Sequence, residues 1–211
     1  MSDPAFFIET PRLYLSYFQP EIDSHCDFLV ELYNTPEFIS SIGGKPTSIT
    51  TREAARKRLA TRFVEEHSRN GYGTYLVSLK PTTDADQTLS SATPFPERLA
   101  ACALVGTVSL MRGEPPDCFA APDLGFAILP AYMRRGIATE AAKALMDYVE
   151  REKGVKDVLG LCDPKNEGSR ATLKRLGFDY RGDMELRVFG GVVGSVWTKP
   201  GMEADLAVYG L

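Results

Sequence analysis

The chain has 211 residues, of which 44% are hydrophobic and 25% are charged, and its formal net charge at pH 7 is −4. This length and composition indicate one globular domain, residues 1–211, whose core needs no metal or disulfide to fold. The acidic balance excludes a general attraction to nucleic acid. No apolar run approaches the roughly 18 residues of a membrane span, and the start shows no secretory signal, so we expect a cytoplasmic protein.

The four cysteines, Cys26, Cys102, Cys118 and Cys162, show no metal-ligand spacing. Because the chain also has only two histidines, this pattern predicts reduced thiols and no metal site. One alternative stays open, in which Cys162 carries an acyl group covalently, although no histidine has an evident reason to lie beside it.

The first half of the chain predicts two strands and two helices joined by polar loops. Alternating large apolar residues indicate the strands, and apolar residues at helical spacing behind capping residues indicate the helices. Two proline-rich stretches, 81–98 and 114–122, are predicted to be loop insertions without secondary structure. The predicted elements are a strand at 12–18, a helix from Asp23 or Ser24 to about residue 34, a helix from Thr50 or Thr51 to about His67, and a strand at 72–80.

The second half predicts further strands around two amphipathic helices. A strand, a helix and a strand between residues 124 and 162 form a parallel unit. The interleaving of helices with strands indicates a mixed α/β sheet. The predicted elements are strands at 100–110, 124–129 and 158–162, helices at 139–153 and from Asn166 to Gly177, and strand-like runs after Phe178 that include 186–189 and 206–209.

The residues Arg134-Arg135-Gly136-Ile137-Ala138 stand directly before the 139–153 helix. The first turn of a helix has free backbone N–H groups and a partial positive charge. Small residues such as Gly136 and Ala138 let a phosphate oxygen approach the main chain, and the two arginines add charge. The segment therefore favours a diphosphate ligand, while a plain turn with solvated arginines remains the alternative. It is neither a Walker A loop nor the GxGxxG dinucleotide fingerprint.

The last predicted helix carries a polar residue on an apolar face. Asn166 offers an amide where the chain leaves strand 158–162, and Ser169 shares a helical face with Leu173 and Leu176. A serine among leucines needs a polar partner. That partner is either a ligand or a backbone carbonyl one turn back along the helix.

Together these two motifs, in this order and about thirty residues apart, resemble the GNAT acetyltransferase superfamily. The branch that they resemble contains the bacterial ribosomal-protein alanine acetyltransferases. The resemblance covers nearly the whole chain, from Glu9-Thr-Pro-Arg-Leu-Tyr-Leu to Ala207-Val-Tyr-Gly-Leu. Its most specific parts are Leu124-Gly-Phe-Ala-Ile-Leu-Pro130, the Arg-Arg-Gly-Ile-Ala turn with Thr139-Glu140-Ala141, and the helix containing Asn166, Ser169 and Leu176-Gly177-Phe178.

The resemblance implies the GNAT fold, an α/β fold with a central, mostly antiparallel sheet, one splayed parallel strand pair and about four flanking helices. It also implies acetyl-CoA as the cofactor, no metal, and a pantetheine arm in the gap between strands 124–129 and 158–162. The residues that it places at the coenzyme are Phe126, Ala127, Ile128, Arg134, Arg135, Gly136, Ile137, Ala138, Thr139 and Asn166.

The same resemblance implies that an amine attacks the thioester directly, while a backbone N–H of strand 124–129 stabilises the oxyanion. Ser169 is then the candidate acid and Asp123 the candidate base, with a surface carboxylate as the alternative reading of Asp123. The chain departs from the family pattern at two positions. Met133 stands where relatives have glutamine or arginine, and Leu173 stands where many relatives have a tyrosine acid.

The function expected from this resemblance is N-acetylation of a peptide N-terminus or a small-molecule amine by a monomer or homodimer, with no nucleic-acid or membrane partner. Phe38 and Trp197 are candidate walls of the acceptor pocket, and each is equally plausible as a core aromatic. Two other functions stay open. One is a non-catalytic, acyl-CoA-binding regulatory module, and the other is a structural domain whose loops 81–98 and 114–122 bind a partner.

Overall fold

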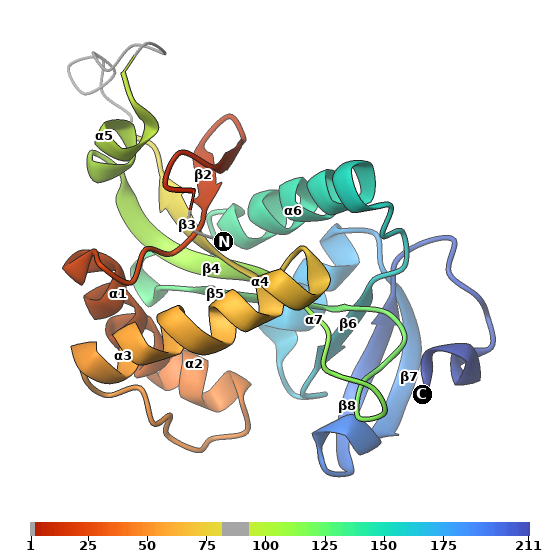
Figure 1. Ribbon diagram of the computed structural model, residues 1–211. Helices are drawn as coiled ribbons and strands as arrows, with labels where there is room; N and C mark the ends of the chain where they lie inside the picture. Colours follow the sequence, from red (N-terminus) through yellow and green to blue (C-terminus); the bar gives the residue numbers. More distant parts are fainter. Residues whose placement is uncertain (1–2, 82–92) are drawn as a thin grey trace.

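The computed structural model describes residues 3–81 and 93–211, and eight strands in this part of the chain form one sheet (Figure 1). The strand order is β1-β2-β3-β4-β5-β6-β8-β7, and every neighbouring pair is antiparallel except β5 and β6. The predicted mostly antiparallel sheet with one parallel pair is therefore confirmed. The strands are β1 (Phe7–Glu9), β2 (Leu13–Ser16), β3 (Thr74–Leu79), β4 (Ala103–Met111), β5 (Asp123–Ile128), β6 (Leu159–Cys162), β7 (Asp179–Leu186) and β8 (Val192–Thr198).

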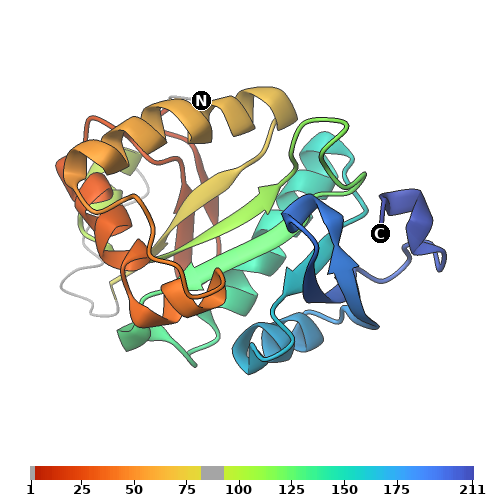
Figure 2. The ribbon, with the colours of Figure 1, turned by 90° about the horizontal axis from the view of Figure 1, so that it is seen from below.

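The four predicted helices are all present, and two short helices accompany them in the described residues. A π-helical turn (Leu59–Phe63) joins α3 to α4, so residues 52–70 run as one rod, which Figure 2 shows crossing the molecule. The helices are α1 (Asp23–Tyr33), α2 (Pro36–Ser41), α3 (Arg52–Arg58), α4 (Val64–Asn70), α5 (Phe95–Ala100), α6 (Ile137–Lys153) and α7 (Glu167–Arg175).

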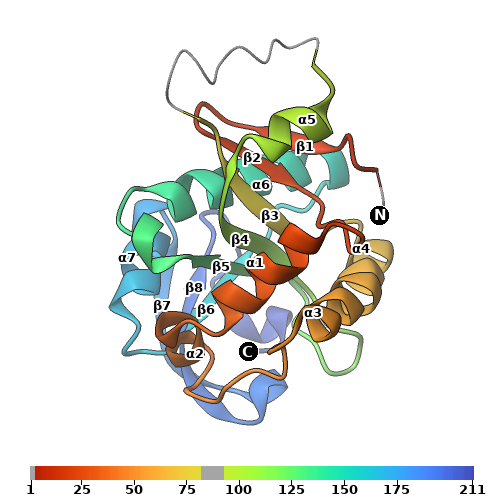
Figure 3. The same ribbon diagram turned by 90° about the vertical axis from the view of Figure 1, so that its left-hand side faces the viewer.

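Helices cover both faces of the sheet because side chains alternate along its strands. In β3, Tyr75 and Val77 pack into the core cluster that contains α6, and Leu76 packs into the cluster that contains α1 and the α3–α4 rod. Figure 3 shows these helices in front of the sheet and α6 behind it. This arrangement explains why the strand reads as apolar on both sides in the sequence.

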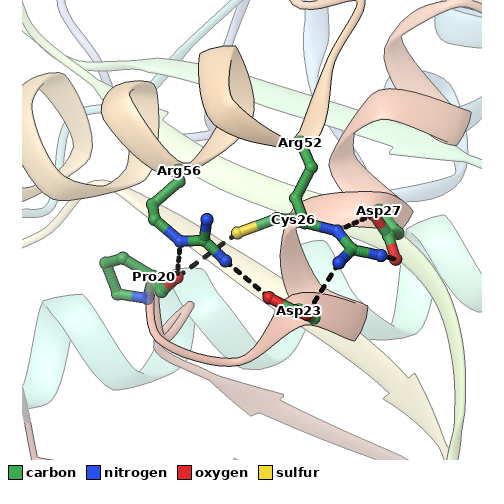
Figure 4. Close-up of polar contacts among 6 residues, drawn as sticks. All are labelled: Pro20, Asp23, Cys26, Asp27, Arg52 and Arg56. Carbon is green, nitrogen blue, oxygen red and sulfur yellow. Dashed lines mark hydrogen bonds and ion pairs between the residues drawn. The ribbon is translucent and has the colours of Figure 1, made fainter.

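An ion-pair cluster on the surface ties α1 to α3 (Figure 4). The guanidinium of Arg52 donates to both carboxylate oxygens of Asp27, at 2.7 and 2.6 Å, and to Asp23 at 2.7 Å. Arg56 contacts the other oxygen of Asp23. These side chains are roughly half exposed, so solvent screening keeps their contribution to stability small.

Two short helices lie where the sequence predicts loops. Residues 36–41 form α2 because Thr35 caps the helix, its hydroxyl accepting from Phe38 N, and Pro36 suits the first position. Residues 95–100 form α5 at the end of the predicted 81–98 loop, because Phe95 and Leu99 are buried against Tyr14. The rest of that predicted loop, 82–92, lies outside the described residues.

The C-terminal region also differs from the sequence prediction. Residues 206–209, predicted to be strand-like, form a 3-10 turn that begins at Asp205, whose carboxylate accepts from Ala207 N. The 186–189 run divides between the end of β7 and a 3-10 turn that precedes Gly190 and Gly191, both with positive φ. Apolar runs this short do not distinguish a strand from a helical turn.

Candidate functional site

The parallel strands β5 and β6 are paired only where they begin. Asp123 and Leu159 form the single register pair, and Leu159 N donates to Pro122 O at 2.9 Å. At the next position Leu161 N donates to the side-chain Oδ1 of Asp123 at 3.0 Å instead of to the β5 backbone. The two strands therefore diverge toward their carboxyl ends, and the predicted splay is confirmed.

The divergence leaves main-chain groups of β5 without a strand neighbour. Leu129 N donates to Val105 O at 2.9 Å, and Ala127 lies opposite Thr107 in the antiparallel pair of β4 and β5. Because hydrogen-bonding direction alternates along a strand, the amides of Phe126 and Ile128 point away from β4 and into the gap. These groups can bond an extended ligand as a further strand would.

The mouth of α6 lies beside this gap and has a specialised backbone. Arg134 and Gly136 both have positive φ, of 61° and 77°. The first helical bond runs from Glu140 N to Gly136 O at 3.0 Å, so the amides of residues 137–139 have no helical acceptor. A Cβ built at Gly136 would meet only an Nη2 atom of Arg12, at 3.5 Å, which leaves this turn open to a ligand.

A cleft of about 1280 Å³ connects the α6 mouth, the gap beside β5, α2 and the start of α7. The predicted residues that line it are Phe38, Phe126, Ala127, Ile128, Arg134, Gly136, Ile137, Ala138, Thr139, Asn166 and Ser169. The cleft is also lined by residues that no sequence pattern predicts: Glu37, Ser40 and Ser41 of α2 and the basic residues Lys165 and Arg175. The sequence signal for α2 is the capping residue Thr35 followed by Pro36.

At the start of α7, Asn166 and Ser169 present free polar groups. The Asn166 Oδ1 atom accepts from Ser169 N at 3.0 Å and so caps the helix, which leaves its amide nitrogen for a ligand. The bond to a carbonyl one turn back is made by Thr172, whose hydroxyl donates to Gly168 O at 2.9 Å. The Ser169 hydroxyl has no hydrogen-bond partner among the described residues and lines the cleft.

Leu173, which stands where many members of the resembled family have a tyrosine, packs inward against β6. Its side chain is 1% exposed, and a Cβ at Gly160 would lie only 2.5 Å from its Cδ2 atom. The leucine thus fills the space against β6. A leucine side chain carries no exchangeable proton, so this position cannot supply an acid.

Asp123 lies at the point where β5 and β6 part, outside the lining of the cleft. Burial raises the pKa of its carboxyl to about 8, and the N–H of Leu161 offsets only part of that rise. Its side chain stands on the same face of β5 as Ala127, the face opposite α6. Asp123 is thus only partly exposed, and its carboxyl accepts from the main chain of β6.

Three further candidates, Arg135, Trp197 and Cys162, are not part of the cleft lining. The guanidinium of Arg135 lies over the Tyr132 ring, 5.4 Å from its centroid. Trp197 is 6% exposed in the core, beside Tyr180, and is not part of the cleft lining. Burial raises the pKa of Cys162 to about 11, so its thiol stays protonated near neutral pH and is a poor nucleophile.

The residues of the cleft fit coenzyme A. The α6 mouth supplies free amides and a positive helix end for a diphosphate, and the splayed edge of β5 supplies main-chain groups for the amide-containing pantetheine arm. Within residues 3–81 and 93–211, no group of three or more histidine, cysteine or acidic side chains is placed to hold a metal ion. No helix in these residues has the length and apolar character needed to cross a membrane.

Comparison with known sequences identifies the family. Residues 12–179 match the model of the acetyltransferase (GNAT) domain. The uncharacterized N-acetyltransferase YnaD of Bacillus subtilis is 30% identical over 60 residues, which is 28% of this chain and 35% of that relative. The chain spans about a third of the length of the curated relatives it matches.

Solved structures share the fold along nearly the whole chain. RimL, the ribosomal L7/L12 α-N-protein acetyltransferase in complex with coenzyme A, matches with a TM-score of 0.64 and 18% identity, over 92% of this chain and 97% of that one. The ribosomal-protein-S5-alanine acetyltransferase from Vibrio fischeri matches with a TM-score of 0.64 and 18% identity, over 95% and 98%. With the family model matching most of its length and the fold in agreement, the chain belongs to the acetyltransferase (GNAT) family.

Proposed function

We propose that this protein transfers an acetyl group from acetyl-CoA to a primary amine, either a peptide N-terminus or a small-molecule amine. The observation that carries the proposal is the divergence of β5 and β6 beside the α6 mouth. In this geometry a diphosphate bound at the amides of residues 137–139 directs the pantetheine arm along β5. The thioester then lies in the cleft between β5 and α7.

Main-chain amides of β5 and the hydroxyl of Ser169 have different roles in the proposed acyl transfer. The amides of Phe126 and Ile128 are the candidate donors to the pantetheine arm and to the oxyanion that forms when the amine attacks the thioester carbon. Ser169 is the candidate acid, because its hydroxyl is free in the cleft. As the C–S bond breaks, this hydroxyl donates to the leaving thiolate, while the amine becomes an amide.

Asp123 is the candidate base, acting through water because its carboxyl lies outside the cleft lining. A pKa of about 8 makes the ionised carboxylate of Asp123 a stronger base than an ordinary aspartate. The ionised form is the minority at neutral pH, so its contribution to turnover should increase as pH rises toward 8. The proton of the attacking amine would pass to Asp123 by this route before the product leaves.

The acceptor side of the cleft is formed by α2. Phe38 lines it and stacks on Tyr33, with ring centroids 4.2 Å apart and planes 12° apart. This stacking fixes an apolar wall beside Glu37, whose carboxylate suits a cationic amine. RimL and the S5 alanine enzyme are named for ribosomal-protein acceptors, which supports testing peptide N-termini first.

The experiment is a thiol-release assay. The protein is mixed with acetyl-CoA and peptides that begin with alanine or serine, or with small amines, and free coenzyme A is followed against a no-amine blank. We expect release above the blank, and at least a tenfold loss of kcat in Ser169→Ala with nearly unchanged coenzyme affinity. Tight binding without release from any amine would instead favour the regulatory module, an alternative that the missing family tyrosine supports.

A further inference from the structure

The segment that precedes β2 is bonded to the first turn of α6, about 130 residues later in the chain. The Glu140 Oε1 atom accepts from the Thr10 hydroxyl at 2.6 Å and from Arg12 N at 3.1 Å. Its Oε2 atom contacts the Arg12 guanidinium through Nε at 2.7 Å and Nη2 at 2.6 Å. Both carboxylate oxygens of Glu140 are therefore held by the N-terminal segment.

The same guanidinium supports the turn at the α6 mouth. Arg12 Nη1 donates to the carbonyl of Arg135 at 3.0 Å. That carbonyl belongs to the residue between Arg134 and Gly136, which both have left-handed backbones. Arg134 is the one non-glycine residue with positive φ in the described chain, a conformation that is unfavourable for an L-residue. A charge-assisted hydrogen bond at this carbonyl offsets that cost.

Glu140 would otherwise oppose an anionic ligand at this position. Its carboxylate stands in the first turn of α6, next to the free amides of residues 137–139. Burial alone would raise its pKa, but the hydrogen bonds from Thr10 and Arg12 outweigh burial and hold the pKa below its ordinary value. The group is thus ionised at neutral pH, and only its partners keep its charge from repelling a diphosphate.

We propose that Arg12 is a positioning residue for coenzyme binding, which fixes the 134–136 turn and neutralises Glu140 so that the α6 mouth accepts a diphosphate. This inference rests on the proposed function, because it takes the ligand to be coenzyme A. Arg12 acts on the coenzyme indirectly, through its contacts with the 134–136 turn and with Glu140. Both contacts favour a ligand that carries a diphosphate.

The test is a double-mutant cycle on coenzyme A binding, measured by calorimetry. We expect Arg12→Gln to raise Kd about tenfold, which corresponds to about 1.4 kcal/mol. Adding Glu140→Gln should restore part of that loss, because the repelling charge is gone while the support of the 134–136 turn is still missing. Arg52→Gln is the matched control: its side chain is equally exposed, 46% against 47%, and is also ion-paired, and its Kd should stay unchanged.

A second readout separates positioning from a general loss of structure. With S-acetylpantetheine, which lacks the diphosphate, Arg12→Gln should keep the wild-type KM. Wild-type affinity for coenzyme A in a folded Arg12→Gln protein, or no recovery of affinity at all on adding Glu140→Gln, would overturn the proposal. If Arg12→Gln does not fold, Arg12→Lys keeps the charge but cannot hold Arg135 O and Glu140 together, and an unchanged Kd there would equally overturn it. Wild-type protein that binds no coenzyme A would refute the proposed function instead.

Discussion

The Asp123 carboxyl, proposed above as the base, also has a structural role. Its side chain replaces a backbone acceptor for Leu161 N at the point where β5 and β6 separate. Without that bond the parting strands would leave a buried N–H unpaired, which is costly. The burial that this position requires is also what raises the pKa of Asp123 to about 8.

This pKa predicts how stability depends on pH. Between the unfolded value, about 3.9, and the folded value of about 8, the folded protein holds a proton that the unfolded chain has released. Stability therefore falls as pH rises through that interval. Asp123→Asn keeps an acceptor for Leu161 N and cannot ionise, so we expect urea unfolding to find it more stable than wild type by at least about 1 kcal/mol at pH 9 and nearly equal at about pH 4, the unfolded pKa. The same difference at both pH values would mean that the carboxyl is solvated.

At the scale of elements, the caps set where the helices begin. Thr35, Thr51 and Asn166 each accept a backbone N–H with their side chains. The Thr51 and Asn166 positions are evident in the sequence because an amphipathic pattern follows each of them. The Thr35 cap precedes a helix of six residues, which is too short for its periodicity to be recognised.

The cap at Thr51 gives a test on the α3–α4 rod. We expect Thr51→Ala to lower the free energy of unfolding by about 1 kcal/mol, because Ala54 N loses its acceptor. Thr61→Ala is the control: its hydroxyl bonds Lys57 O inside the same rod, and removing that bond is expected to change stability little. Urea unfolding of both variants measures the difference, and equal losses would mean that capping does not limit this helix.

At the scale of the molecule, the cleft joins segments from distant parts of the sequence. α2, β5, the α6 mouth and the start of α7 all contribute to its lining. A ligand that contacts all of them binds only the folded chain, so it should stabilise the protein as a whole.

This coupling predicts a thermal shift. At acetyl-CoA concentrations about 100 times Kd, the folded state gains about 2.7 kcal/mol, which for a chain of this size corresponds to a rise in Tm of about 5–10 °C. Differential scanning fluorimetry measures it, with S-acetylpantetheine at the same concentration as the control. A shift of the same size with that control would show that the diphosphate contributes nothing to binding.

The sequence by itself determined the elements with long periodic patterns and the turn before α6, because those features depend on local backbone geometry. Residues 134–139, Asn166 and Ser169 were found in this way, and all of them except Arg135 line the cleft. Only the tertiary structure decided that Trp197 belongs to the core, that the Asp123 carboxyl accepts from Leu161 N, and that Arg12 reaches Glu140. Burial and contacts between distant segments depend on how the sheet is assembled, and no local pattern encodes that assembly.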